Sequence, residues 1–356
     1  MRGGALRSDA ALGVRRRGLR DVFVRLEPTN PPRNAEMPPR ATSANVPFPP
    51  RCPPASAATT ALRPSGSPGG TSIHFPAAMS EPHHQAFKEF EAAGWSANAA
   101  GYDRLTGRIT ACVADALLEA AGAGPGVRLL DVGCGPGHLC ATAAARGAVP
   151  TGVDLAEGMV AAARRLHPEL TFHTGDAEAL PFPDGAFDAA LAAFVVNHVP
   201  TPERAASELA RVVAPHGRVV VAMWDQPERV AFLGLLDEAM REAAVRPDAA
   251  VPPGPPAFRF ADEAELRGLL EGAGLEGAAV HEVGFSYAIA DAGELWDGIQ
   301  SGSVRTAAQL RSLSDGERAR VREALHRLLD ARRSEADGGL ALETAVKIAV
   351  GVRPAG

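Results

Sequence analysis

Three closely spaced glycines form the segment of this sequence with the clearest chemical meaning. Gly133, Gly135 and Gly137 make a GxGxG turn directly after the apolar run 129–132. Glycines permit positive φ angles and let a ligand approach the backbone closely, and a helix that begins after such a turn offers free N–H groups. The pattern therefore predicts a nucleotide-type binding loop between a buried strand and a helix.

Two aspartates near this turn distinguish between kinds of nucleotide. Asp131 lies two residues before the first glycine, where its charge would repel a pyrophosphate but attract a cation. Asp154 follows the next apolar run, where an acid can bind ribose hydroxyls. His138 stands where the dinucleotide fingerprint GxGxxG has its third glycine. These features favour a cationic sulfonium nucleotide, S-adenosylmethionine, over a nicotinamide dinucleotide.

Strands and helices are expected to alternate around these residues, which is typical of a parallel sheet with helices on both faces. The periodicity predicts strands over 127–132, 149–153, 170–173, 187–196, 218–224, 280–285 and 340–352. It predicts helices over 81–99, 103–121, 138–146, 157–166, 202–213, 228–244, 292–300 and 315–333, and one after Asp262. The expected fold is α/β, with a Rossmann-like seven-stranded, mostly parallel sheet, an antiparallel last strand and a helical cap insertion.

The first 78 residues differ in composition from the rest of the chain. They contain 13 of the 30 prolines and 11 arginines against four acids, and they lack sustained hydrophobic periodicity. Such a segment buries too little apolar surface to offset its ordering entropy, so we expect a disordered extension. Its composition fits a transit peptide, but we favour an upstream extension before a true start at Met79. Residues 79–356 then form one domain with cap segments 226–258 and 286–338.

Charge and hydropathy limit the partners. Residues 79–356 carry 25 basic and 38 acidic side chains, a net charge of −13. Because nucleic-acid affinity depends on neutralising phosphates, we expect no nucleic-acid partner. No apolar run reaches the roughly 20 residues of a membrane span, and the cysteines lack zinc-site spacing. We therefore expect a cytoplasmic protein without a membrane span or metal, and the sequence makes no prediction of oligomeric state.

Further segments extend the pattern of the glycine turn. In order and spacing they resemble the motifs of the class I S-adenosylmethionine-dependent methyltransferases, in particular the menaquinone/ubiquinone-type and small-molecule enzymes. The resemblance covers residues 99–225 closely, with His216 where a glycine is usual. The matching segments are 129–137, 153–159, 175–182, 187–188 and 208–217.

This resemblance implies a role for each matching residue. The turn, with Cys134 between its glycines, is expected to hold the methionine part and ribose of the cofactor. Asp131 is expected near the cofactor's amino group and Asp154 at the ribose hydroxyls. The other implied contacts are Leu155 and Met159 at the adenine ring, Asp176 and Ala177 at the adenine amino group, Phe194 near the sulfonium, and Tyr102 as a lid, with core packing as the equal alternative for Tyr102.

His198 is the candidate for acid–base chemistry. Methyl transfer from a sulfonium is an in-line displacement for which the protein supplies orientation and desolvation. A general base is required only where the acceptor must lose a proton. His198 follows the fourth expected strand, near the expected methyl group, and is the catalytic candidate, although a structural role is the favoured alternative. His281 is a second, weaker candidate.

The expected acceptor is a small, partly apolar molecule. Residues 197–200, Asn-His-Val-Pro, do not match the N/D-P-P-F/Y motif of enzymes that methylate nucleic-acid amino groups. Oxygen, nitrogen and carbon acceptors all stay open. The alternatives are a methyltransferase acting on RNA or protein and a non-catalytic scaffold with the cofactor fold. We expect most apolar cap residues to pack the cap and a minority to line a pocket, out of Phe232, Leu233, Leu235, Leu236, Met240, Phe258, Phe260, Trp296 and Ile299.

Overall fold

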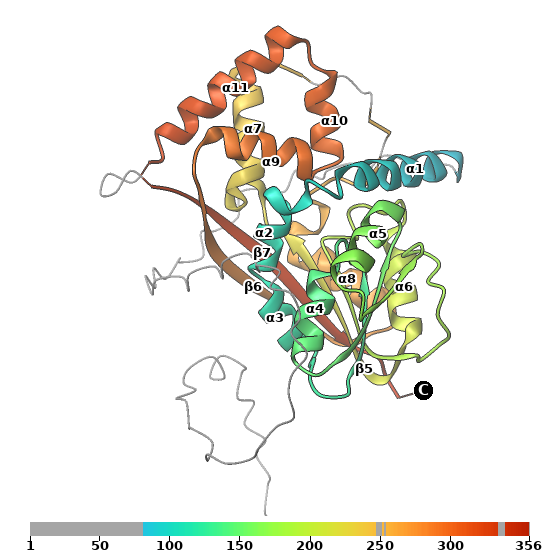
Figure 1. Cartoon of the computed structure of the whole chain (residues 1–356). Coiled ribbons are helices and arrows are strands. Elements are labelled where there is room, and N and C mark those ends of the chain that lie inside the picture. Colours follow the sequence, from blue (N-terminus) through green and yellow to red (C-terminus); the bar gives the residue numbers. More distant parts are fainter. Residues whose placement is uncertain (1–80, 247–250, 253, 334–338, 356) are drawn as a thin grey trace, which may run out of the picture. The chain divides into compact units, whose positions relative to one another are not determined.

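A seven-stranded sheet forms the centre of the structure, a computed structural model that describes residues 81–246, 251–252, 254–333 and 339–355 (Figure 1). The strand order is β3-β2-β1-β4-β5-β7-β6, and β7 runs antiparallel to both β5 and β6. The predicted α/β fold is therefore confirmed, whereas the expected extension over residues 1–78 lies outside the described residues. The strands are β1 (Arg128–Val132), β2 (Val149–Asp154), β3 (Thr171–Thr174), β4 (Phe187–Ala193), β5 (Val213–Trp224), β6 (Glu276–Ile289) and β7 (Leu340–Val352).

Helices surround the sheet, and several begin with recognisable capping signals. Pro202 occupies the first turn of its helix, where its missing N–H has no cost. Ser314 and Glu317 form a capping box in both directions. The helices are α1 (Glu81–Asn98), η2 (Tyr102–Arg104), α2 (Thr106–Ala111), α3 (Ala114–Ala120), α4 (His138–Ala145), α5 (Glu157–Leu166), α6 (Pro202–Val212), η3 (Pro227–Arg229), α7 (Ala231–Glu242), η4 (Arg259–Ala261), α8 (Glu263–Gly272), α9 (Ala292–Gly302), α10 (Arg305–Ser312) and α11 (Asp315–Asp330).

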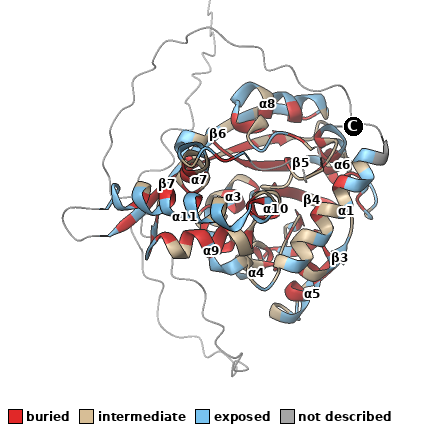
Figure 2. Ribbon diagram, turned by 90° about the horizontal axis from the view of Figure 1, so that it is seen from above, coloured by how far each residue is buried: buried red, intermediate tan, exposed pale blue. Residues whose placement is uncertain are grey.

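The core has two layers because the side chains of each strand alternate between the faces of the sheet. Leu129 and Leu191 belong to a cluster with α3, α4 and the helices that follow β5 and β6. Leu130 and Ala190 belong to a second cluster with α6 and α8. Burial follows the same plan in Figure 2, where the central strands are mostly red and the outer faces of the helices are pale blue.

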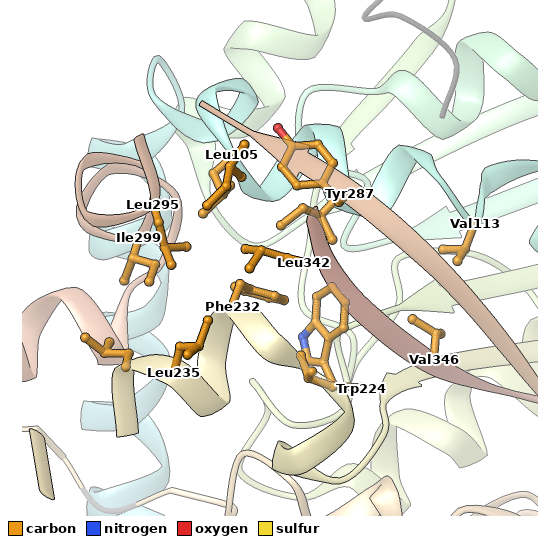
Figure 3. Packing of buried hydrophobic residues seen from close by; sticks show 14 of the residues in the cluster. Leu105, Val113, Trp224, Phe232, Leu235, Tyr287, Leu295, Ile299, Leu342 and Val346 are labelled. Atoms are coloured by element: carbon orange, nitrogen blue, oxygen red, sulfur yellow. The ribbon is translucent and has the colours of Figure 1, made fainter. Parts of the chain in front are cut away.

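The helices α7, α9, α10 and α11 form a cap beyond the far ends of β6 and β7 (Figure 1). Phe232 and Leu235 of α7, Ile299 of α9 and Leu342 of β7 lie in one buried cluster (Figure 3). Trp224 at the end of β5 belongs to the same cluster, so the cap packs directly against the last parallel strand. Within the described residues, no helix has the length and apolarity to cross a membrane.

The main differences between the predicted and the observed elements are three. The single helix predicted over 103–121 is divided into η2, α2 and α3, because Leu105 leaves helical geometry and the N–H groups of Cys112 and Val113 bond three residues back. The helix α10 was not predicted. The strand predicted over 280–285 extends over 276–289, since antiparallel pairing with β7 continues along its whole length.

Candidate functional site

The glycine turn has the backbone geometry that its sequence predicts. Gly133, Gly135 and Gly137 have φ angles of 68°, 52° and 85°. A Cβ at Gly133 would lie 2.3 Å from Cγ2 of Val195, and one at Gly137 would lie 2.7 Å from the ring of Phe172. Both the φ angles and the close neighbours therefore exclude a larger residue at the first and third glycines.

A cavity of about 420 Å³ opens at the carboxyl ends of β1, β2 and β4, within the range typical of ligand sites. This edge is where open α/β sheets bind ligands. The cavity continues from the glycine turn to the cap. The predicted site residues that line it are Tyr102, Gly133, Gly135, Asp154, Leu155, Met159, Asp176, Ala177, Phe194 and His198.

Three predicted cofactor residues, Asp131, Cys134 and Gly137, do not line this cavity. Cys134 is buried in a small cluster with Phe172, on the side of the turn that faces α4 and α5. Gly137 is covered by the same ring. Asp131 is 2% exposed and its carboxylate accepts a 3.4 Å hydrogen bond from Sγ of Cys140. These three residues therefore pack on the side of the turn that faces away from the cavity.

Two carboxylates favour a positive charge at this end of the cavity: Asp154 lines it, and Asp131 is buried behind the glycine turn. The carboxylate of Asp154 accepts hydrogen bonds from the backbone N–H of Gly135, at 2.9 Å, and of Ala156, at 2.8 Å. Burial nevertheless raises the pKa of Asp154 above its ordinary value. Burial also raises the pKa of Asp131 to about 7, with a smaller contribution from the charge of Asp154. A cation bound here would stabilise the ionised form of both groups.

The third acid, Asp176, is held by a lysine that the sequence analysis did not single out. Nζ of Lys88, on α1, donates to Oδ2 of Asp176 at 2.6 Å and also pairs with Glu178. The other carboxylate oxygen of Asp176 accepts from the backbone N–H of Glu178 at 2.8 Å. Helix α1 is thereby tied to the end of β3, next to the predicted adenine contacts.

Tyr102 and Phe194 are fixed by aromatic contacts. The ring of Tyr102 meets Trp95 edge to face at 6.1 Å, and burial raises the pKa of its phenol to about 12. Phe194 has a φ angle of 61° and stacks on Trp224, with ring centroids 4.0 Å apart. A positive φ in a residue with a side chain is uncommon and is typical of functional positions.

His198 contacts a buried acid that also escaped the sequence analysis. Nδ1 of His198 lies 3.0 Å from Oε2 of Glu91, which is 2% exposed. Nε1 of Trp95 donates to the same oxygen at 2.9 Å. Nε of Arg305 lies 3.3 Å from Oε1 of Glu91. His281, the weaker base candidate, is exposed on β6 and does not line the cavity.

The cap end of the cavity is mostly aromatic and apolar. Of the nine apolar cap residues proposed from the sequence, Phe232 and Leu233 line the cavity and the others do not, as the predicted minority requires. Trp224 meets Phe232 edge to face at 5.2 Å. Polar side chains at this end include Thr106, Thr110, Ser303, Arg305, Thr306 and Gln309.

The residues that the sequence analysis missed come from α1 and from the segment 302–309. Lys88, Glu91 and Trp95 are spaced three and four residues apart, so they share one face of α1. Arg305 and Gln309 show the same spacing on α10. The sequence contained a signal for α1, a charged face beside Phe87, but none that connected it with His198.

Comparison with known proteins gives a consistent result. Residues 130–221 match the model of a family described as "Methyltransferase domain". A demethylmenaquinone methyltransferase of Beutenbergia cavernae is 36% identical over 185 residues, 52% of this chain and 73% of that protein. The protein of the same name from Thermus thermophilus is 44% identical over 111 residues, which are 30% of this chain and 50% of that protein.

Solved structures with a similar fold have lower identity. The YcgJ protein of Bacillus subtilis is 20% identical, with 68% of this chain and 98% of that chain covered and a TM-score of 0.44. A phosphoethanolamine N-methyltransferase of Haemonchus contortus, solved with S-adenosylhomocysteine, is 18% identical, with 68% and 52% covered and a TM-score of 0.41.

Proposed function

The chain belongs to the class I S-adenosylmethionine-dependent methyltransferases, and we propose that it methylates a small, partly apolar molecule bound at the cap end of the cavity. The cofactor is S-adenosylmethionine. The residues present fit it, because the turn at Gly133 leaves no room for a Cβ and the carboxylates of Asp154 and of the buried Asp131 favour a cation. When bound, this cofactor supplies an activated methyl group on a positively charged sulfur.

We assign the cofactor contacts to the carboxyl ends of the first three strands. The backbone of Gly133 and Gly135 would face the methionine part and ribose, and Asp154 would accept from the ribose hydroxyls. Leu155 and Met159 would pack on the adenine ring. Asp176 and Ala177 would face the adenine amino group, with Phe194 and Tyr102 closing the site toward the cap and Asp131, Cys134 and Gly137 supporting the turn.

The acceptor assignment rests on the composition of the cap end. Trp224, Phe232 and Leu233 offer apolar surface, and Thr110 and Gln309 offer a few polar groups, as is common for small-molecule sites. Among the described lining residues, both Lys88 and Arg305 already face carboxylates. An anionic acceptor would therefore meet no unpaired lysine or arginine there, which favours a neutral molecule.

Two further observations support a small acceptor. The relatives named demethylmenaquinone methyltransferase act, by their names, on a small molecule. The acidic charge of residues 79–356 disfavours a nucleic-acid partner. We treat residues 79–356 as one methyltransferase domain, with 226–258 and 286–338 as its cap segments.

A labelled-methyl transfer experiment tests the proposal. The protein and S-adenosylmethionine with a labelled methyl group are added to an extract of the source organism, which is then separated into small molecules, RNA and protein. We expect label among the small molecules. In an Asp154→Ala variant, cofactor affinity should fall at least about 100-fold, and the label transfer should be lost. Asp188→Asn is the matched control, because this acid lies at the opposite end of β4, paired with Arg128. Label in RNA or protein would overturn the acceptor assignment.

A further inference from the structure

The imidazole of His198 is held from one side and free on the other. Its Nδ1 lies 3.0 Å from Oε2 of Glu91. A carboxylate can only accept a hydrogen bond, so Nδ1 carries the proton of the neutral ring and Nε2 keeps its lone pair. His198 lines the cavity with 23% of its side chain exposed, and Nε2 has no hydrogen-bond partner among the described residues.

Glu91 is itself held in place by several contacts. The carboxylate is 2% exposed, and the positive charge of Arg305 lies 3.3 Å from its second oxygen. The guanidinium of Arg305 is held in turn by the backbone oxygens of Pro255, at 2.7 Å, and Asn197, at 2.8 Å. Nε1 of Trp95 fixes the oxygen that faces His198. A buried acid with this many contacts has one orientation, so it sets the plane and tautomer of the imidazole.

Such a pair suits an acceptor that must lose a proton. A neutral amine attacks with its own lone pair and needs no base before transfer, whereas a hydroxyl oxygen becomes a good nucleophile only as its proton leaves. The cavity that His198 lines is also aromatic, since Trp224 stacks on Phe194 and Phe232 meets Trp224 edge to face. The cavity thus combines an aromatic lining, which suits a planar ring, with a proton acceptor.

We propose that the acceptor is a planar molecule with a hydroxyl group, that His198 takes the hydroxyl proton on Nε2, and that Glu91 is its positioning residue. This inference rests on the proposed function. As the oxygen–carbon bond to the methyl group forms, the methyl–sulfur bond breaks and its electron pair stays on sulfur, which becomes a neutral thioether. The hydroxyl proton moves to Nε2, and the imidazolium formed, stabilised by Glu91, later releases that proton to water.

The test compares two probes of the same shape, 1-naphthol and 1-naphthylamine, each with S-adenosylmethionine that carries a labelled methyl group. We expect a methyl ether from the naphthol and at least about tenfold slower transfer to the amine. His198→Asn should lower transfer to the naphthol by about 100-fold or more. Glu91→Gln should lower kcat about tenfold and change KM less than about twofold, since it acts on the base and not on the ring surface. Glu89→Gln, exposed on the same helix and bonded to Gln85, is the matched control.

A second readout is independent of any acceptor. Nuclear magnetic resonance of protein labelled with ¹⁵N-histidine, with the His198→Asn variant as assignment, should show the neutral ring of His198 protonated on Nδ1. This preference should be lost in Glu91→Gln.

Three results would overturn the proposal. They are equal methylation of the amine, methyl transfer to a ring carbon of the naphthol, and a wild-type His198 protonated on Nε2. If neither probe accepts a methyl group, the measured tautomer of His198 alone decides whether the proposal holds. Failure of the proposed function itself would appear separately, as loss of cofactor binding by calorimetry and of label transfer in the extract.

Discussion

The cofactor end and the acceptor end of the cavity are assembled from the chain in different ways. The cofactor end uses residues 133–177, three consecutive strands and the turns that follow them. The acceptor end combines α1, the end of β5, α7, the segment 254–257 and α10, which are spread over more than half of the chain. The first end is determined by backbone geometry and local order, the second by packing between distant helices.

The two ends also differ in whether their acidic side chains have charged partners. At the cofactor end, neither the buried Asp131 nor the half-buried Asp154 forms a salt bridge with a lysine or arginine of the described residues. Desolvation raises the pKa of both. At the acceptor end, Glu91 faces Arg305 and His198. An acid in a desolvated environment without a charged partner destabilises the folded protein until a cation binds. An acid with a charged partner is already stabilised before any ligand binds. These two acids of the cofactor end are thus left without a cationic partner, whereas the acid of the acceptor end already has one.

The largest effect is expected at the glycine turn, where the backbone itself is the binding group. In Gly133→Ala, the new methyl group would lie 2.3 Å from Cγ2 of Val195 at a φ of 68°. We expect cofactor affinity to fall at least about 100-fold and stability to fall by about 1–3 kcal/mol. Titration calorimetry and urea unfolding measure the two effects.

Gly268→Ala is the matched control, because Gly268 lies within α8 and a Cβ added there would meet no described atom within 4 Å. This substitution should raise stability by about 0.5–1 kcal/mol and leave cofactor affinity unchanged. Equal cofactor affinity in wild type and Gly133→Ala would mean that the turn does not hold the cofactor, and the comparison between the two ends would fail.

These differences explain how far the sequence could predict the site. Gly133 and Asp154 were found because strand, turn and acid follow one another at fixed spacing, and parallel strands bring such ends together. Glu91 and Arg305 were missed because nothing local connects residues 214 positions apart along the chain. The break of the predicted helix 103–121 was missed for the same reason: its hydrophobic spacing is helical throughout, and tertiary packing decides where it turns. Sequence pattern therefore predicted the sheet and residues that line one cavity, but not the partner of His198.

A second prediction concerns the charge at the cofactor end. Because burial raises the pKa of Asp131 to about 7, the folded protein keeps a proton on this group that the unfolded chain releases near its ordinary value of 3.8. Stability from this group is therefore present at low pH and is lost as the pH rises toward 7. Asp131→Asn removes the effect. Its stability relative to wild type should increase by about 2 kcal/mol between about pH 5 and about pH 8.

Urea unfolding at the two pH values, without cofactor, measures this difference. Asp188→Asn serves as the control, since the hydrogen bond from Arg128 lowers the pKa of Asp188 and the group stays ionised over this whole range in both folded and unfolded chains. Its effect on stability should be the same at both pH values. A constant effect of Asp131→Asn as well would show that Asp131 is not held in a neutral form by burial.

The smallest expected effect lies at the acceptor end. It concerns a substitution that should change acceptor binding but not cofactor binding. Phe232 is 4% exposed and places its ring edge toward Trp224 at 5.2 Å. Phe232→Leu keeps an apolar side chain but removes the aromatic edge, so the KM for an aromatic acceptor should rise about fivefold while cofactor affinity changes less than about twofold. Phe260→Leu, fully buried beside α8 and away from the cavity, should match its loss of stability, about 1 kcal/mol, without the change in KM. If both substitutions changed the KM equally, the effect would come from general loosening of the core, and Phe232 would have no particular part in binding the acceptor.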